Sequence, residues 1–151
     1  MMIDFELRPA LESEVLSVAF VFRQSRLKML GFLPELHTFE EDIQFFKERV
    51  FPENRVVVAE LTADRQLVGF IAYKNRHIDH LYVLPEFTGK GVGFSLLNEA
   101  KAASSDLKLW VFQANKDAVA FYKRNGFSTI EETEGEGNEE KLPDYLMQWS
   151  R

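Results

Sequence analysis

The chain has 151 residues, about the length of one ordinary domain, and 46% of them are hydrophobic, as in a globular protein. Its 24 acidic and 18 basic side chains give a formal net charge of −6, with no block of lysine or arginine. That balance argues against nucleic acid or an anionic membrane as the main partner. Because there is no cysteine, disulfides, a thiolate nucleophile and cysteine-based zinc or iron–sulfur sites are excluded. We expect a single domain over residues 1–151.

Nothing in the sequence favours export or insertion into a membrane. The N-terminal segment carries acidic residues where a signal peptide would carry lysine or arginine. The longest apolar stretches, residues 15–22 and 67–73, are far shorter than a membrane-spanning helix. The sequence therefore predicts a cytoplasmic protein without a membrane partner.

The first third of the chain predicts one strand and two helices. Alternating apolar and polar residues predict the strand, and apolar residues at helical spacing predict both helices. Thr38 and Glu41 have the spacing of a capping box at the start of the second helix, and Pro52 is expected to end it. The predicted elements are residues 3–8, 12–30 and 39–50.

From Arg55 onward the pattern becomes that of a sheet with two further helices. Three consecutive strands with short links predict an antiparallel meander. After the helix at residues 91–104, the elements are expected in the order strand, helix, strand, strand. The predicted fold class is therefore a mixed α/β sheet. The predicted strands are residues 56–61, 67–73, 77–83, 108–112, 127–132 and 142–149, and the predicted helices are residues 91–104 and 115–125.

A glycine-rich turn, Thr88-Gly89-Lys90-Gly91-Val92-Gly93, joins the third strand of the meander to the next helix. Glycines permit positive φ and close approach of a ligand, and the unpaired N–H groups of a helix start suit a phosphate. The turn lacks the glycine spacing of the dinucleotide fingerprint and the Ser/Thr of a Walker A loop. Two alternatives follow: another phosphate-bearing ligand, or a tight turn with no ligand.

Two segments resemble the GNAT family, the GCN5-related N-acetyltransferases. The turn, preceded by Val83-Leu84-Pro85, resembles the acyl-CoA-binding motif Gln/Arg-x-x-Gly-x-Gly/Ala, with Thr88 at the Gln/Arg position. Residues 115–127 resemble the family's Asn-x-x-Ala-x-x-Phe-Tyr-x-x-x-Gly-Phe block. The predicted element order matches as well, so the resemblance covers essentially the whole chain. It implies the GNAT fold, an antiparallel meander followed by βαβαββ.

The resemblance implies acetyl-CoA as co-substrate and no metal. In the family the strand before the loop splays from its neighbour, and the pantetheine arm pairs with the exposed backbone. Asn115 would contact the CoA arm, cap its helix, or both. Lys90 would reach a phosphate or remain a solvated loop residue. The implied cofactor-binding residues are Leu81, Tyr82, Val83, Thr88, Gly89, Lys90, Gly91, Val92, Gly93 and Asn115.

The same resemblance makes Tyr122 the acid that protonates the departing thiolate, a role that suits a phenol with a pKa of roughly 10. The alternative is an aromatic pair with Phe121 that only packs the helix. The base is expected from His77 and Asp79, which share one face of their strand, whereas His80 faces the other side and is expected to be structural. That parity also argues against a metal site shared by the histidines. Free amine drawn from solution is the alternative to a dedicated base.

The implied acceptor is a primary amine on a small molecule, peptide or protein. Six glutamates of the final hairpin would steer a cationic amine or form a solvated loop, and Glu35 and His37 are expected on the acceptor side. A non-catalytic CoA sensor and an interaction domain are the alternative functions, and a homodimer is implied by the resemblance alone. The hairpin glutamates are Glu131, Glu132, Glu134, Glu136, Glu139 and Glu140.

Overall fold

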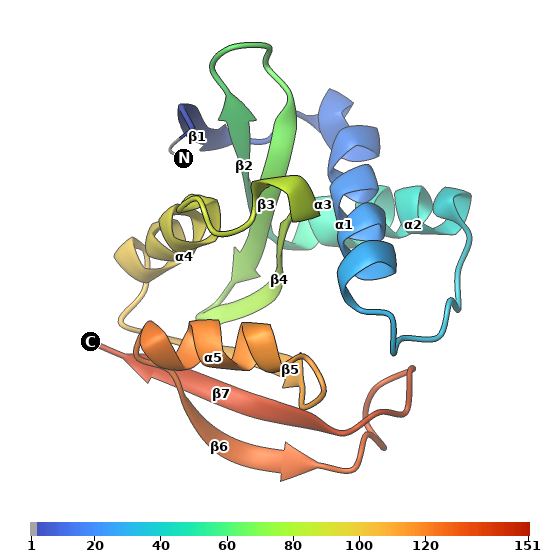
Figure 1. Cartoon of the computed structure of the whole chain (residues 1–151), viewed down its shortest axis with the longest axis vertical. Coiled ribbons are helices and arrows are strands. Elements are labelled where there is room, and N and C mark those ends of the chain that lie inside the picture. The colour runs from blue at the N-terminus through green and yellow to red at the C-terminus, as the bar shows by residue number, and fades with distance from the viewer. Residues whose placement is uncertain (1–2) are drawn as a thin grey trace.

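The computed structural model describes residues 3–151, so Met1 and Met2 of the acidic N-terminal segment lie outside the described residues. Within that range seven strands form one mixed sheet in the order β1-β2-β3-β4-β5-β7-β6 (Figure 1). Neighbouring strands are antiparallel except β4 and β5, which run parallel. The strands are β1 Phe5–Pro9, β2 Arg55–Leu61, β3 Leu67–Lys74, β4 His77–Val83, β5 Asp106–Phe112, β6 Ser128–Thr133 and β7 Asp144–Ser150.

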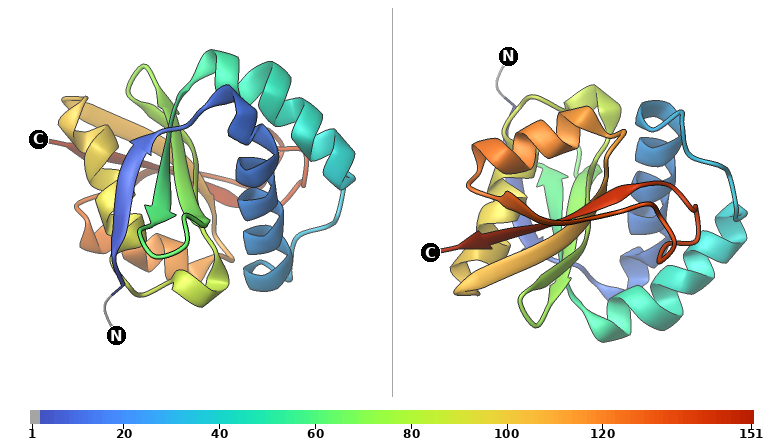
Figure 2. Two further views of the ribbon diagram at one scale, coloured as in Figure 1. Left: turned by 90° about the horizontal axis from the view of Figure 1, so that it is seen from above. Right: turned by 90° about the horizontal axis from the view of Figure 1, so that it is seen from below.

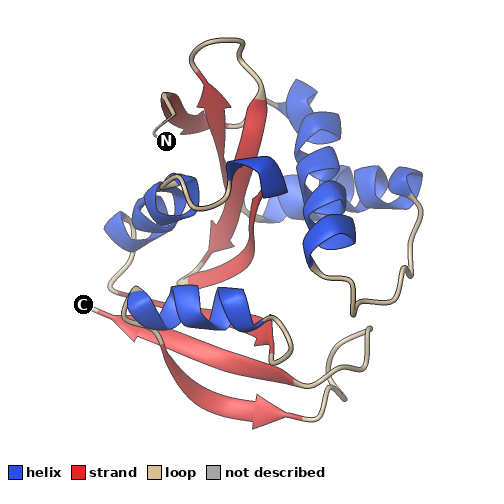
Figure 3. Ribbon diagram, in the orientation of Figure 1, coloured by secondary structure: helices blue, strands red, loops and turns tan. Residues whose placement is uncertain are grey.

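Helices cover both faces of this sheet, with α1 and α2 on one side and α4 and α5 on the other (Figures 2 and 3). None of the described helices combines the length and apolar character that crossing a membrane requires. The helices are α1 Val15–Met29, α2 Phe39–Phe45, α3 Phe51–Glu53, α4 Val92–Ala102 and α5 Lys116–Arg124, with short turns η1 Glu12–Glu14, η2 Phe46–Val50 and η3 Pro85–Phe87.

The predicted mixed α/β sheet is confirmed, and the second helix departs from prediction at its end. Its capping box forms as expected, because the Thr38 hydroxyl accepts from the Glu41 N–H at 3.2 Å and the Glu41 carboxylate accepts from the Thr38 N–H at 2.9 Å. The helix then continues through the π-helical turn η2 and past Pro52 to Glu53. Pro52 stands in the first positions of α3, where a missing N–H is tolerated.

The sheet opens in its middle, between β4 and β5. These strands pair at only two positions in the part of the chain described, His77 with Lys108 and Ile78 with Leu109. From His80 to Val83, β4 is paired with β3 on one side, and from Asp79 to Val83 it has no strand partner on the other within residues 3–151. The splay that the resemblance implied is therefore present, and it leaves backbone N–H and C=O groups open to a ligand.

Aromatic side chains form the core between α1, η2 and the meander. Phe46 and Phe70 are both 0% exposed. The Phe46 ring centroid lies 5.0 Å from that of Phe22, 5.7 Å from that of Phe70 and 5.5 Å from that of His80. This cluster fixes one face of β4 against α1.

Candidate active site

The turn between β4 and α4 presents a row of backbone donors. Gly89 and Gly91 have φ of +73° and +87°, a conformation that a side chain would strain. The N–H groups of residues 91–94 form no backbone hydrogen bond within residues 3–151. Such groups at the positive end of a helix dipole suit a phosphate. The turn therefore suits a phosphate-bearing ligand, as the resemblance implied.

Thr88 bonds within its own turn and does not reach toward the helix start. Its hydroxyl donates to the Pro85 carbonyl at 3.0 Å, and its side chain is exposed. Lys90 is half-buried in the same loop. The loop thus offers backbone N–H groups where relatives also offer a Gln or Arg side chain.

We expect Thr88→Arg to leave the affinity for acetyl-CoA unchanged or to raise it up to about tenfold, roughly 1.4 kcal/mol, because a guanidinium adds charge-assisted hydrogen bonds to a phosphate. Isothermal calorimetry measures the change. Thr129→Arg, on the exposed face of β6, is the matched control for added charge. A clear loss of affinity in Thr88→Arg alone would contradict this placement of the diphosphate.

A cavity of about 170 Å³ lies where β4 and β5 separate, and both Asn115 and Tyr122 line it. The Asn115 side-chain oxygen accepts from the Ala118 N–H at 3.3 Å, so the predicted N-cap of α5 is present. Tyr122, from the same helix, is buried. Burial, with a smaller contribution from Tyr82, raises the pKa of the Tyr122 phenol above its ordinary value. Tyr122 therefore keeps its proton at neutral pH.

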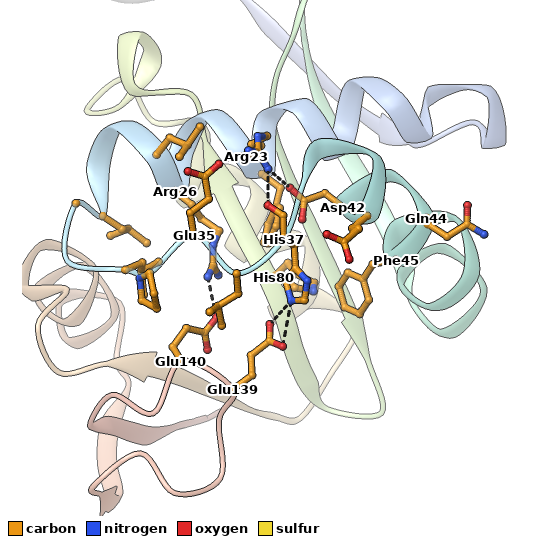
Figure 4. Close-up of a pocket in the computed structure, with 18 residues that line it drawn as sticks. Arg23, Arg26, Glu35, His37, Asp42, Gln44, Phe45, His80, Glu139 and Glu140 are labelled. Carbon is orange, nitrogen blue, oxygen red and sulfur yellow. Dashed lines mark hydrogen bonds and ion pairs between the residues drawn. The ribbon is translucent and has the colours of Figure 1, made fainter.

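A second cavity, of about 770 Å³, lies between α1, the connection to α2 and the loop between β6 and β7 (Figure 4). Two of the six hairpin glutamates line it, and the other four do not. The expected acceptor-side residues lie there too, so the structure brings these distant segments together. The predicted residues that line it are Glu35, His37, Glu139 and Glu140. Phe22 and Phe45 line it as well.

Two ion pairs connect the β6–β7 loop to the opposite wall of the larger cavity. Arg26 of α1 contacts Glu140 at 2.8 Å, and His37 Nε2 lies 2.9 Å from Glu139 Oε1. The hydrogen bond with Glu139 is the main cause that raises the pKa of His37. The loop also bonds internally, since the Asn138 amide donates to the Leu142 carbonyl at 2.8 Å. These contacts hold the loop as a wall of the cavity.

His80 lines both cavities and so marks the place where they meet. Its ring packs against Phe22, Phe45 and Phe46, with centroids 5.5 to 6.1 Å apart, and forms no hydrogen bond with any residue from 3 to 151. Burial, with Arg26 and Lys74 nearby, lowers the pKa of His80 to about 4. The imidazole is therefore neutral and has a free nitrogen lone pair at neutral pH.

The predicted base residues His77 and Asp79 lie together at the start of β4. His77 lines neither of the two cavities, and Asp79 lines the smaller one. His77 Nδ1 lies 3.2 Å from Asp79 Oδ1, and Lys74 Nζ lies 3.3 Å from Asp79 Oδ2. Burial alone would raise the pKa of Asp79, but the hydrogen bond with His77 and the charge of Lys74 outweigh it and lower the pKa to about 2. The Asp79 carboxylate is thus a weak proton acceptor.

Arg26 carries no motif in the sequence and was not predicted as a site residue. Tyr82 was expected to bind the cofactor as part of its strand, without a role for its side chain, and His80 was expected to be structural. No local sequence pattern identifies the roles of these side chains, because those roles depend on which face of β4 packs under α1. No group of three or more His, Asp or Glu side chains within residues 3–151 is arranged to hold a metal ion.

Residues 24–149 match the model of the acetyltransferase (GNAT) domain family. The peptidyl-lysine N-acetyltransferase YjaB of Escherichia coli is 36% identical over 83 residues, which are 55% of this chain and 56% of the relative. The spermidine N(1)-acetyltransferase of Thermoplasma acidophilum is 37% identical over 82 residues, which are 48% of this chain and 50% of the relative. The chain thus spans about half the length of the curated relatives it matches.

Solved structures share the fold along nearly the whole chain. The apo form of Escherichia coli YjaB has a TM-score of 0.80 at 24% identity and covers 97% of this chain and 98% of its own. The PaiA N-acetyltransferase from Thermoplasma acidophilum in complex with coenzyme A has a TM-score of 0.74 at 24% identity and covers 99% and 100%. Because the family model matches residues 24–149, the chain belongs to the GNAT acetyltransferase family, as its glycine-rich turn and the 115–127 block predicted.

Proposed function

We propose that the protein transfers an acetyl group from acetyl-CoA to a primary amine by direct attack in a ternary complex. One observation carries this proposal: the gap between β4 and β5 and the larger cavity beside α1 meet at His80. A thioester in the gap and an amine in the larger cavity would approach each other there. Proximity of this kind supplies much of the rate enhancement in a two-substrate reaction.

The charge of the larger cavity favours a cationic acceptor. Its lining has five carboxylates against two arginines and the imidazole of His37, and such an excess of carboxylates attracts a positively charged amine. Apolar rings beside these charges suit the methylene chain of a lysine side chain or a polyamine. The names of the relatives, peptidyl-lysine and spermidine N-acetyltransferases, support the same two classes. The charged lining residues are Glu35, Glu41, Asp42, Glu139, Glu140, Arg23 and Arg26.

The proposed chemistry follows from the position of each group. The N–H groups of residues 91–94 bind the diphosphate, and the backbone of residues 81–83 pairs with the pantetheine arm. Once the bound ammonium has lost one proton to solvent, the amine nitrogen attacks the carbonyl carbon. His80, in place of His77 or Asp79, then takes the second proton from the nitrogen. When the C–S bond breaks, Tyr122 donates its proton to the thiolate. Because the sequence has no cysteine, no thiol carries the acetyl group in between.

The test is to mix the purified protein with acetyl-CoA and a panel of amines and to follow release of free thiol. The panel contains spermidine, a lysine-containing peptide and a neutral aromatic amine. We expect release that depends on a cationic amine. Tight binding of acetyl-CoA without turnover would favour the CoA-sensor alternative, and absence of binding would contradict both.

His80→Phe keeps an aromatic ring in the core but removes both nitrogens. We expect kcat/KM to fall about 10- to 100-fold, at or below the lower end of general-base effects. The effect is small because a group with so low a pKa is a weak base. In the wild type, a pKa of His80 of about 4 predicts that this group causes no loss of kcat/KM until the pH falls below about 5. Steady-state rates across pH measure both effects. His77→Phe is the comparison, and a larger loss there would return the base to His77.

A further inference from the structure

The hydroxyl of Tyr82 contacts Arg26 and keeps its own proton unused within residues 3–151. Tyr82 stands in the part of β4 that does not pair with β5, and it is one of the residues that line the smaller cavity. Arg26 Nη1 donates to the Tyr82 hydroxyl oxygen over 3.4 Å. A phenol both accepts and donates, and a guanidinium only donates. The O–H of Tyr82 therefore remains a free donor, since it has no acceptor within residues 3–151.

Arg26 is fixed from several sides behind that hydroxyl. Its guanidinium contacts Glu140 at 2.8 Å and lies over the Phe22 ring, 5.0 Å from the centroid. The Phe22 ring in turn packs edge-on against Tyr82 at 5.2 Å. The side chains of Arg26 and Glu140 are 22% and 10% exposed. The contacts with Glu140 and Phe22 thus fix the side chains of Arg26 and Tyr82 relative to each other.

We infer that Tyr82 is a further catalytic residue, whose hydroxyl hydrogen-bonds the thioester carbonyl oxygen, and that Arg26 is the positioning residue that aims and polarises it. This inference rests on the proposed function. A neighbouring cation makes an O–H a stronger donor, and a donor fixed before the reaction stabilises developing charge best.

The step balances without moving the proton of Tyr82. The amine nitrogen forms a bond to the carbonyl carbon, and the π pair moves to the oxygen, which becomes the oxyanion held by Tyr82. The nitrogen passes its surplus proton to His80, the pair returns to form the amide carbonyl, the C–S bond breaks, and the thiolate takes its proton from Tyr122. Solvent then removes the proton from His80 and returns one to Tyr122. The two tyrosines that line the gap therefore act on different atoms, Tyr82 on the oxygen and Tyr122 on the sulfur.

The test is Tyr82→Phe, which removes the hydroxyl and keeps the ring packing. We expect kcat to fall about 100-fold, as for the loss of one oxyanion donor, while the Kd of acetyl-CoA and the KM of the amine change less than about twofold, because the donor acts mainly in the transition state. Tyr145→Phe, in β7 and outside both cavities, is the matched control and should keep full activity.

A double-mutant cycle tests the role of Arg26. We expect Arg26→Gln to lower kcat about tenfold in the wild type but less than about twofold in the Tyr82→Phe background, because Arg26 acts through the hydroxyl. Equal effects in both backgrounds, or a loss of acetyl-CoA affinity that parallels the loss of kcat, would overturn the inference in favour of a packing role. An active wild type with an equally active Tyr82→Phe overturns this inference alone. A wild type that acetylates no amine overturns the proposed function and this inference with it.

Discussion

Replacing Tyr122 with phenylalanine is expected to lower kcat about 10²- to 10³-fold, within the usual range for loss of a general acid. Without the phenol, the thiolate has to leave unprotonated or take a proton from water. The Tyr122 hydroxyl has no hydrogen-bond partner within the described range, and the residue is buried. Its removal should therefore change the free energy of unfolding little. Amine-dependent thiol release measures the rate, and urea denaturation measures the stability.

The control is Tyr73→Phe, a buried tyrosine of β3 that lines neither cavity and should keep its activity. Because the pKa of Tyr122 is raised above its ordinary value, the wild type should lose no activity from this group as the pH rises to about 10. A Tyr122→Phe enzyme with full kcat would instead support the simple aromatic pair with Phe121, whose ring centroid lies 5.3 Å from that of Tyr122.

Phe46→Ala is expected to reduce the free energy of unfolding by about 3–5 kcal/mol, since a fully buried ring is lost and a cavity remains. Phe46 is 0% exposed and packs against Phe22, Phe70 and His80. A domain with a total stability of about 5–15 kcal/mol would come close to unfolding. Equilibrium urea denaturation measures the change.

The neighbouring residue provides the comparison. Phe45 is 46% exposed, so Phe45→Ala should cost less than about 1 kcal/mol. The milder Phe46→Leu, which should stay folded, would admit water to His80 and move its pKa from about 4 toward about 6.5. The acid limb of kcat/KM would then move to higher pH. A loss below about 1 kcal/mol in Phe46→Ala would contradict the central place given to this ring in the core.

The order of elements could be predicted because its signals are local. The capping box at Thr38 and Glu41 and the alternation along the strands depend on residues a few positions apart, and both appear in the structure. The end of the second helix was placed too early because Pro52 occupies the start of a new turn. A proline stops a helix only where its missing N–H would be needed.

The candidate site was harder to predict because it depends on contacts between distant segments. Parity along β4 separates His77 and Asp79 from His80, but it does not tell which face lies under α1 and α2. The contact of Arg26 with Tyr82 joins residues 56 positions apart, and that with Glu140 joins residues 114 apart. No short motif encodes such pairs. The resemblance to the family supplied the turn and the tyrosine of α5 without these neighbours.

The two-residue pairing of β4 with β5 gives this sheet an edge in its interior. β5 and β7 pair along seven residues, whereas β4 and β5 share two. Exposed edges are normally a hazard, because the strand of another molecule can add to them. Here the open groups of β4 lie in the interior of the sheet beside β5 and not at its outer edge. The fold can thus leave backbone groups unpaired for a narrow ligand, such as the proposed pantetheine arm. Because these groups lie inside the sheet, they are less exposed to strands of other molecules than those of an outer edge.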